Sequence, residues 1–174
     1  WFHRRACLEA LGDPSAELEF VAQVLDDDAK NYHAWGHRQW VLRTYALWED
    51  ELDYIDRLLE EDVRNNSAWN QRHFVIEQTD GFDQLETLRR EAAFALSHIR
   101  RAPSNASPWN YLRGLVEKAP RGAAAVDETL PDVRPACEEL AIVGECGNCV
   151  EGPSEDADSG AACVMAISML VELL

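Results

Sequence analysis

Tryptophan recurs at a nearly constant interval, and this repeat limits the possible folds more than any other feature of the sequence. Four tryptophans are separated by 34, 34 and 40 residues: Trp1, Trp35, Trp69 and Trp109. An asparagine precedes each of the last three by four residues: Asn31, Asn65 and Asn105. A period near 34 residues is typical of stacked helical hairpins, in which each hairpin buries its apolar face against the next. The sequence therefore predicts an all-α fold, a right-handed superhelix of α-hairpin repeats.

Apolar spacing places two helices in each repeat. One helix is predicted over residues 32–45 and another over 67–77, each beginning near a repeat Trp. The helices between them carry apolar side chains at helical spacing: Trp48, Leu52, Ile55, Leu58 and Leu59, and then Leu85, Leu88, Ala92, Leu96 and Ile99. Asp13 and Pro14 have the pattern of an N-cap followed by a proline at the first helical position, which predicts that a helix begins there.

Three regions follow from this pattern. Residues 1–118 are predicted to hold the repeats, the first of them partial because residues 1–5 match residues 35–39 at the end of a motif. Residues 119–160 are rich in Ala, Gly, Pro and acidic side chains, so we expect a poorly ordered linker with at most a short helix over 135–143. Residues 161–174 are expected to begin a further, truncated helix, whose mostly apolar surface needs a covering partner. The sequence is interpreted as a fragment.

Charge and composition exclude several classes of function. The formal net charge is −16, and nucleic-acid binding needs a concentrated basic face, so we expect no nucleic-acid partner. No apolar run is long enough for a membrane span and no secretory signal is visible, which favours a cytoplasmic protein. The five cysteines are interpreted as reduced thiols, and the pair Cys146 and Cys149 lacks a second pair that would complete a metal site. We predict no metal bound by this chain.

Most of the repeated side chains are expected to be structural. The tryptophans should fill the space between neighbouring hairpins. Three arginines stand three residues after a repeat Trp, on the same side of the helix: Arg4, Arg38 and Arg72. Their planar guanidinium groups can bridge to carboxylates or carbonyls of an adjacent repeat.

Residues 30–33 are the best candidates for chemistry. Lys30, Asn31, Tyr32 and His33 are crowded at the start of a predicted helix, in a chain with only two lysines. A helix N-terminus favours anions, and these side chains could add charge and hydrogen bonds to a diphosphate. The alternative that they serve only to pack the loop stays open. The sequence contains no nucleotide-binding loop, no nucleophile elbow and no zinc-protease motif.

Three motifs carry a resemblance to a known family. They are the segments 30–38, from Lys-Asn-Tyr-His-Ala-Trp to Arg38, 62–72, Asp-Val-Arg-Asn-Asn-Ser-Ala-Trp-Asn-Gln-Arg, and 106–112, Ala-Ser-Pro-Trp-Asn-Tyr-Leu. They resemble the prenyltransferase α-subunit repeats, most closely those of the α subunit shared by protein farnesyltransferase and geranylgeranyltransferase type I. The resemblance covers Trp1 to about Lys118 and is faint beyond Pro120.

The resemblance implies a helical subunit that wraps a β subunit and supports prenyl transfer from an isoprenoid diphosphate to the C-terminal cysteine of CaaX-box proteins. It implies that zinc lies in the β subunit, that the complex uses magnesium, and that Lys30, Asn31, Tyr32 and His33 face the diphosphate edge of the site. The family's principal lysine would stand five residues before Trp1, so no catalytic residue is assigned here and the chain alone is not expected to be active. Two alternatives remain: a tetratricopeptide-like interaction scaffold, and the α subunit of Rab geranylgeranyltransferase.

Overall fold

A computed structural model describes residues 1–120, 122–145 and 159–174, and the helices in this part of the chain confirm the all-α hairpin class. The chain divides into two compact units, Trp1–Thr79 and Asp80–Leu174. None of the described helices combines the length and the apolar character that crossing a membrane requires.

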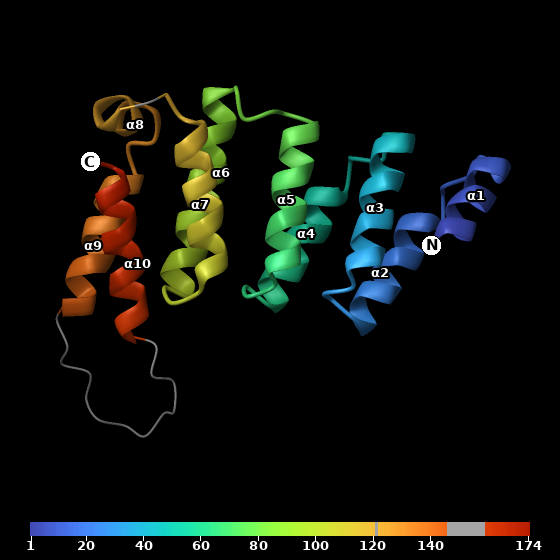
Figure 1. The fold of residues 1–174 in the computed structure, drawn as a ribbon, viewed down its shortest axis with the longest axis horizontal. Helices are drawn as coiled ribbons and strands as arrows, with labels where there is room; N and C mark the ends of the chain where they lie inside the picture. Colours follow the sequence, from blue (N-terminus) through green and yellow to red (C-terminus); the bar gives the residue numbers. More distant parts are fainter. Residues whose placement is uncertain (121, 146–158) are drawn as a thin grey trace, which may run out of the picture. The chain divides into compact units, whose positions relative to one another are not determined.

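The first unit contains five helices in its described sequence. They are α1 (Phe2–Leu11), α2 (Glu17–Asp27), α3 (Tyr32–Tyr45), α4 (Glu51–Glu61) and α5 (Asn66–Gln78). Helix α2 packs against α3, and α4 packs against α5, each pair joined by a short turn (Figure 1). The predicted bounds of α3 are confirmed, and those of α5 are extended by one residue at each end.

The start of α2 differs from the prediction. The helix begins at Glu17 rather than at Pro14. The side chain of Asp13 accepts a hydrogen bond from the Ser15 amide, and the Pro14 carbonyl accepts one from Glu17. Asp13 and Pro14 therefore build a turn that precedes the helix, because an aspartate side chain can bind the backbone two residues later instead of capping a helix.

The second unit contains α6 (Leu85–Arg101), α7 (Ala106–Lys118), α8 (Ala123–Thr129), α9 (Val133–Glu145) and α10 (Ser159–Glu172). Helix α6 pairs with α7 and α9 pairs with α10 (Figure 1). Leu88, Ala92, Leu96 and Ile99 of α6 are buried as predicted, whereas Leu85 is half-exposed at the first position of the helix.

The region predicted to be a poorly ordered linker contains one unpredicted helix, and the short helix expected over 135–143 is present and longer than expected. The region of residues 119–160 contains α8 and α9, and its residues 146–158 lie outside the described part of the chain. Val126 of α8 and Val133 and Cys137 of α9 are buried, and Leu130 is buried in the turn between the two helices. Arg89 of α6 donates hydrogen bonds to the carbonyls of Thr129 and Glu128, at 2.9 Å each. Burial of these apolar side chains stabilises two helices in a segment rich in Ala and acidic side chains.

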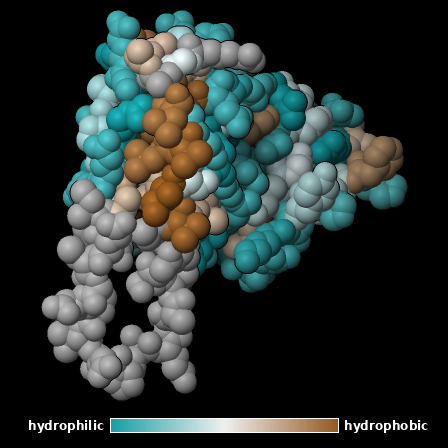
Figure 2. All heavy atoms as spheres, turned by 60° about the vertical axis from the view of Figure 1, so that its left-hand side comes forward, coloured by the Kyte–Doolittle hydropathy of each residue, from teal (hydrophilic) through white to brown (hydrophobic). Residues whose placement is uncertain are grey.

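Among the described residues, helix α10 is covered on one face. Ala166, Met169 and Leu173 are buried, Arg113 of α7 pairs with Glu172, and Arg134 of α9 donates to the Leu173 carbonyl. The opposite face exposes a stripe of apolar side chains (Figure 2): Val164, Ile167, Val171 and Leu174. The sequence predicted that this helix needs a covering partner. Helices α7 and α9 of the same chain cover one of its faces.

Candidate functional site

The turn before α3 is built in the same way as the turns before α5 and α7. Asn31 is the N-cap of α3, and its side chain accepts a hydrogen bond from the Ala34 amide at 3.1 Å. Asn65 and Asn105 also cap their helices: the Asn65 side chain accepts from the Ser67 and Ala68 amides, and the Asn105 side chain accepts from the Ser107 amide. The repeat tryptophans each donate from the indole nitrogen to the carbonyl six residues earlier, at 2.8 to 3.0 Å. Asn31 therefore has a structural role as a helix cap, independent of any role of Lys30, Tyr32 and His33.

The side chains on either side of this cap are free to face solvent. Lys30, Tyr32 and His33 are all exposed, and Tyr32 retains 83% of its accessible surface. The rings of Tyr32 and His33 meet edge to face with their centroids 5.6 Å apart. Of the four residues predicted together, three are therefore available to a ligand and one holds the helix end.

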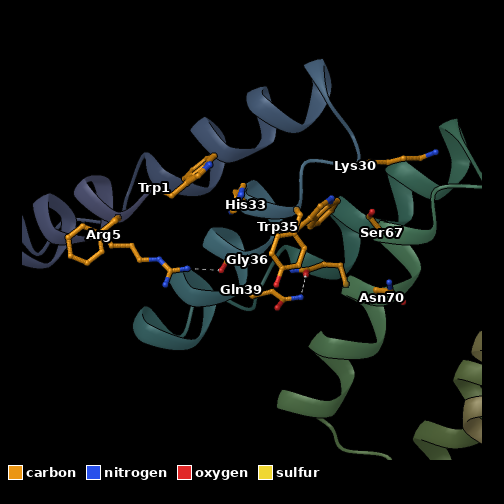
Figure 3. A pocket seen from close by; sticks show the side chains of 12 residues that line it. Trp1, Arg5, Lys30, His33, Trp35, Gly36, Gln39, Ser67 and Asn70 are labelled. Atoms are coloured by element: carbon orange, nitrogen blue, oxygen red, sulfur yellow. Dashed lines mark hydrogen bonds between the residues drawn. The ribbon is translucent and has the colours of Figure 1, made fainter.

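These three side chains lie along an open groove of about 520 Å³ in the first unit (Figure 3). Its other lining residues come from α1, α3 and α5: Trp1, Phe2, Arg5, Trp35, Gly36, Gln39, Ser67, Asn70 and Gln71. The lining contains basic, aromatic and neutral polar side chains and not one carboxylate. Since the chain has 32 acidic and 16 basic residues, a lining of this composition is an exception on the surface of this protein. We call it the basic groove.

Hydrogen bonds hold the wall of the basic groove in place. Arg5 donates to the Gly36 carbonyl at 3.1 Å, and Gln39 donates to Gln71 at 3.0 Å (Figure 3). A Cβ added at Gly36 would meet nothing within 4 Å. The glycine therefore leaves open space in the groove wall, where a bulkier side chain would project.

The structure confirms that the three repeat arginines bridge helices. Arg4 forms a bidentate pair with Glu17, Arg38 forms one with Glu51, and Arg72 pairs with Asp56. Arg38 also donates to the Leu18 carbonyl at 2.8 Å. Arg38 and Glu51 are almost completely buried, so each charge depends on the other for solvation.

A set of buried carboxylates was missed by sequence reasoning. Glu17, Glu51 and Glu91 are separated by 34 and 40 residues, which is also the spacing of the last three repeat tryptophans. Each meets a polar side chain 20 residues later: His37, Gln71 and Tyr111 respectively. This shared interval was the available signal. Glutamate side chains are usually solvated, so their repetition did not predict burial. Their partners are a histidine, a glutamine and a tyrosine, so no single residue type recurs at the partner position.

The environment of His37 and Glu17 shifts the pKa of both groups. Burial lowers the pKa of His37 below its usual 6.5, although its contact with the Glu17 carboxylate, 2.5 Å from Nε2, acts in the opposite direction. Burial alone would raise the pKa of Glu17, but hydrogen bonds from Arg4 and His37 outweigh it, so the pKa is lowered. Arg5 lies 3.5 Å from His37 Nδ1, which leaves Nε2 as the protonated nitrogen that donates to Glu17.

Nothing in residues 1–120, 122–145 and 159–174 brings together three or more His, Cys, Asp or Glu side chains that could hold a metal ion. Cys137 is buried, and that burial raises the pKa of its thiol to about 12. Cys146 and Cys149 lie outside the described residues.

Comparison with known proteins points to one family. A protein-family model described as "Protein prenyltransferase alpha subunit repeat" matches residues 14–45, 48–79 and 88–119, which together cover more than half of the chain. Each matched segment contains one of the tight hairpins: α2 with α3, α4 with α5, and α6 with α7. The repeat therefore runs from each non-tryptophan helix to the tryptophan helix that follows it.

Two individual proteins are similar to parts of the chain. The protein farnesyltransferase/geranylgeranyltransferase type-1 subunit alpha of Dictyostelium discoideum is 55% identical over 31 residues, 18% of this chain and 10% of that protein. A solved structure of Candida albicans protein geranylgeranyltransferase-I complexed with GGPP matches with a TM-score of 0.61 and 29% identity, over 79% of this chain and 51% of that one. The chain thus spans about half the length of the matched structure.

Proposed function

The chain belongs to the family of prenyltransferase α-subunit repeat proteins, and on this basis we propose that it acts as the α subunit of a heterodimeric CaaX protein prenyltransferase. In the proposed reaction, the cysteine thiolate of a protein substrate attacks C1 of a farnesyl or geranylgeranyl diphosphate. The bond between C1 and the diphosphate oxygen breaks, and its electron pair leaves with the diphosphate. We propose that a β subunit supplies zinc and most of the site, that magnesium belongs to the complex, and that the complex is cytoplasmic.

The observation that carries this proposal is the composition of the basic groove. Lys30 and Arg5 are cationic, His33 can donate a hydrogen bond, and no carboxylate lines the groove to repel a diphosphate. Trp1, Phe2, Tyr32 and Trp35 line it as well and offer aromatic surface to an isoprenoid chain. A groove that joins cationic and aromatic side chains suits a ligand with an anionic head and an apolar tail.

Within this groove we assign a role to each exposed side chain. Lys30 contributes charge toward the diphosphate, and Tyr32 and His33 donate hydrogen bonds as negative charge develops on the leaving group. Such donors accelerate a reaction when they are already positioned where charge develops. The Asn31 cap fixes the turn that carries all three, so its contribution is to position them.

The comparisons bear differently on the two alternative functions, a tetratricopeptide-like scaffold and a Rab geranylgeranyltransferase α subunit. A tetratricopeptide-like scaffold is disfavoured because the family model matched by all three repeats is that of prenyltransferase α subunits. A Rab-type α subunit shares those repeats. The similar Dictyostelium and Candida proteins both carry names of the farnesyltransferase/geranylgeranyltransferase type I class, and this favours the CaaX assignment.

The proposal is tested by co-expressing the chain with a farnesyltransferase β subunit or a geranylgeranyltransferase type I β subunit. Size-exclusion chromatography should show co-elution with at least one of them. The complex is then titrated with farnesyl and geranylgeranyl diphosphate, and tryptophan fluorescence reports the affinity. We expect Lys30→Ala to weaken diphosphate binding by about 10- to 100-fold, the usual value of a hydrogen bond to a charged group.

Arg64 provides a matched control. It occupies the position equivalent to Lys30 in the next turn, where its amide binds Asp62 as the Lys30 amide binds Asp28, and its side chain is exposed. It does not line the basic groove. Arg64→Ala should leave the affinity within about twofold of the unmodified complex. Equal losses in the two variants would argue against the groove as the diphosphate edge, and absence of co-elution with any β subunit would argue against the subunit assignment.

A further inference from the structure

A second groove in the first unit has the opposite chemical character. It has a volume of about 730 Å³ and runs between α2 and α4, closed at one end by the turn between α3 and α4. Six carboxylates line it, against two guanidinium groups: Glu19, Asp26, Glu49, Asp50, Glu51 and Glu61, with Arg38 and Arg57. We call it the acidic groove. None of its lining residues lines the basic groove.

The negative charge of the acidic groove is only partly neutralised. Glu51 is paired with Arg38 inside the fold. Glu19, Asp26 and Glu61 are exposed, and the structure shows no ion pair for these three side chains among the described residues. Carboxylates with low-dielectric walls beside them concentrate a negative potential, which attracts a cationic ligand. Leu18, Ala22, Leu47, Trp48 and Leu58 add apolar surface to the same groove.

Tyr54 supplies an independent indication that the acidic groove has a ligand. It lines the groove, is 9% exposed, and its buried hydroxyl has no hydrogen-bond partner among the described residues. Most buried polar groups in proteins are satisfied, so an unsatisfied hydroxyl requires an explanation. Arg38 lies over the Tyr54 ring at 3.9 Å. The guanidinium carbon of the exposed Arg57 lies 5.9 Å from the centroid of the same ring.

We propose that the acidic groove binds a lysine- or arginine-containing segment of a partner protein. The cationic side chains pair with Glu19, Asp26 and Glu61, and their aliphatic parts pack on the apolar surface of the groove. The Tyr54 hydroxyl gains the partner it lacks, because a peptide offers carbonyl acceptors as well as cationic donors. An incoming cation also repels Arg57 away from the ring. The inference does not depend on the proposed prenyltransferase role.

The test measures binding of a fluorescently labelled ten-residue peptide of alternating lysine and alanine by fluorescence anisotropy at low salt. The groove variant combines Glu19→Gln, Asp26→Asn and Glu61→Gln. It should bind the peptide at least 10-fold more weakly than the unmodified chain. A control variant removes the same charge from exposed positions outside the groove, with Glu9→Gln, Asp53→Asn and Glu60→Gln. Its affinity should change by less than threefold.

Tyr54→Phe separates a built site from general attraction to an acidic protein. Removing an unsatisfied buried hydroxyl should leave the melting temperature of the free chain unchanged or raise it, while peptide affinity falls by threefold or more. Equal weakening in the groove and control variants would overturn the proposal, because it would show attraction to net charge alone. A Tyr54→Phe chain that binds as tightly as the unmodified one would overturn it as well, as would absence of peptide binding at millimolar concentration.

Discussion

Two buried carboxylates, Glu17 and Glu51, join consecutive helices of the first unit. Glu17 and Glu51 are the first residues of α2 and α4, and each meets an arginine 13 residues earlier and a polar side chain 20 residues later. A carboxylate at a helix N-terminus is stabilised by the helix dipole, and a buried one requires hydrogen-bonding partners. Each carboxylate therefore ties its own helix to the helices on both sides of it in sequence.

The His37 position makes one of these junctions sensitive to pH. Because burial lowers its pKa, the folded state resists protonation of His37 and the unfolded state does not. Neutral His37 therefore makes its full contribution to the free energy of unfolding above about pH 6.5. This contribution is lost as the pH falls from there toward the pKa of His37 in the folded state. We expect the urea midpoint of unfolding to fall between pH 7.5 and pH 5.5, with a slope of at most about 1.4 kcal/mol per pH unit from this group.

A glutamine at this position tests the cause. Gln71 makes the equivalent hydrogen bond to Glu51 at 2.8 Å without a titrating group. The His37→Gln variant should therefore lose less stability over the same pH range than the unmodified chain. The range stays above the ordinary pKa of glutamate, so Glu17 contributes little to the comparison. Parallel pH profiles for the two proteins would show that His37 is not the titrating group.

At the scale of the element, each tryptophan helix begins at the same local structure. Helices α3, α5 and α7 each begin with an asparagine cap. In each case the indole of the repeat tryptophan donates a hydrogen bond to a carbonyl in the turn before the helix. The cap satisfies backbone amides that lack a partner in the first turn of a helix. All three parts come from a stretch of about ten residues, so the sequence alone can specify where these helices begin.

Loss of one cap should be measurable. Asn65 is buried, and its side chain accepts hydrogen bonds from the amides of Ser67 and Ala68. We expect Asn65→Ala to lower the free energy of unfolding by about 0.5 to 2 kcal/mol in urea titrations. The neighbouring Asn66 is exposed, and Asn66→Ala should change it by less than about 0.5 kcal/mol. A loss of similar size in both variants would contradict the assigned cap.

At the scale of the whole molecule, stability should be distributed between the two compact units. In a repeat protein each hairpin contacts mainly its neighbours, so a local defect is felt locally. Trp69 lies in the first unit and Trp109 in the second, both nearly inaccessible to solvent. Changing either tryptophan to Ala should lower the free energy of unfolding by about 3 to 5 kcal/mol, because a large cavity replaces the aromatic ring.

Hydrogen exchange measured by mass spectrometry can locate the loss. Trp69→Ala should increase amide exchange mainly in peptides from residues 1–79, and Trp109→Ala mainly in peptides from residues 80–145. The unmodified chain measured under the same conditions provides the reference. If either variant increased exchange equally in both units, the chain would be a single cooperative structure rather than two units with local stability.

The sequence by itself determined the helical class, the positions of the tryptophan helices and the helix start that carries residues 30–33. These features depend on local periodicity, on caps and on turn residues, all of which are encoded within one hairpin. Four of the five apolar residues predicted for the core of α6 were confirmed as buried for the same reason, since they recur at helical spacing: Leu88, Ala92, Leu96 and Ile99.

Only the tertiary structure decided the rest. Helices α8 and α9 owe their stability to burial of four apolar positions that composition obscured, and Arg89 reaches their turn from 40 residues away. The basic groove collects residues from α1, α3 and α5, and the acidic groove collects residues from α2 and α4. Pairing of buried charges and the lining of a groove depend on contacts between segments distant in sequence, and the free energy of such contacts exists only once the chain has folded.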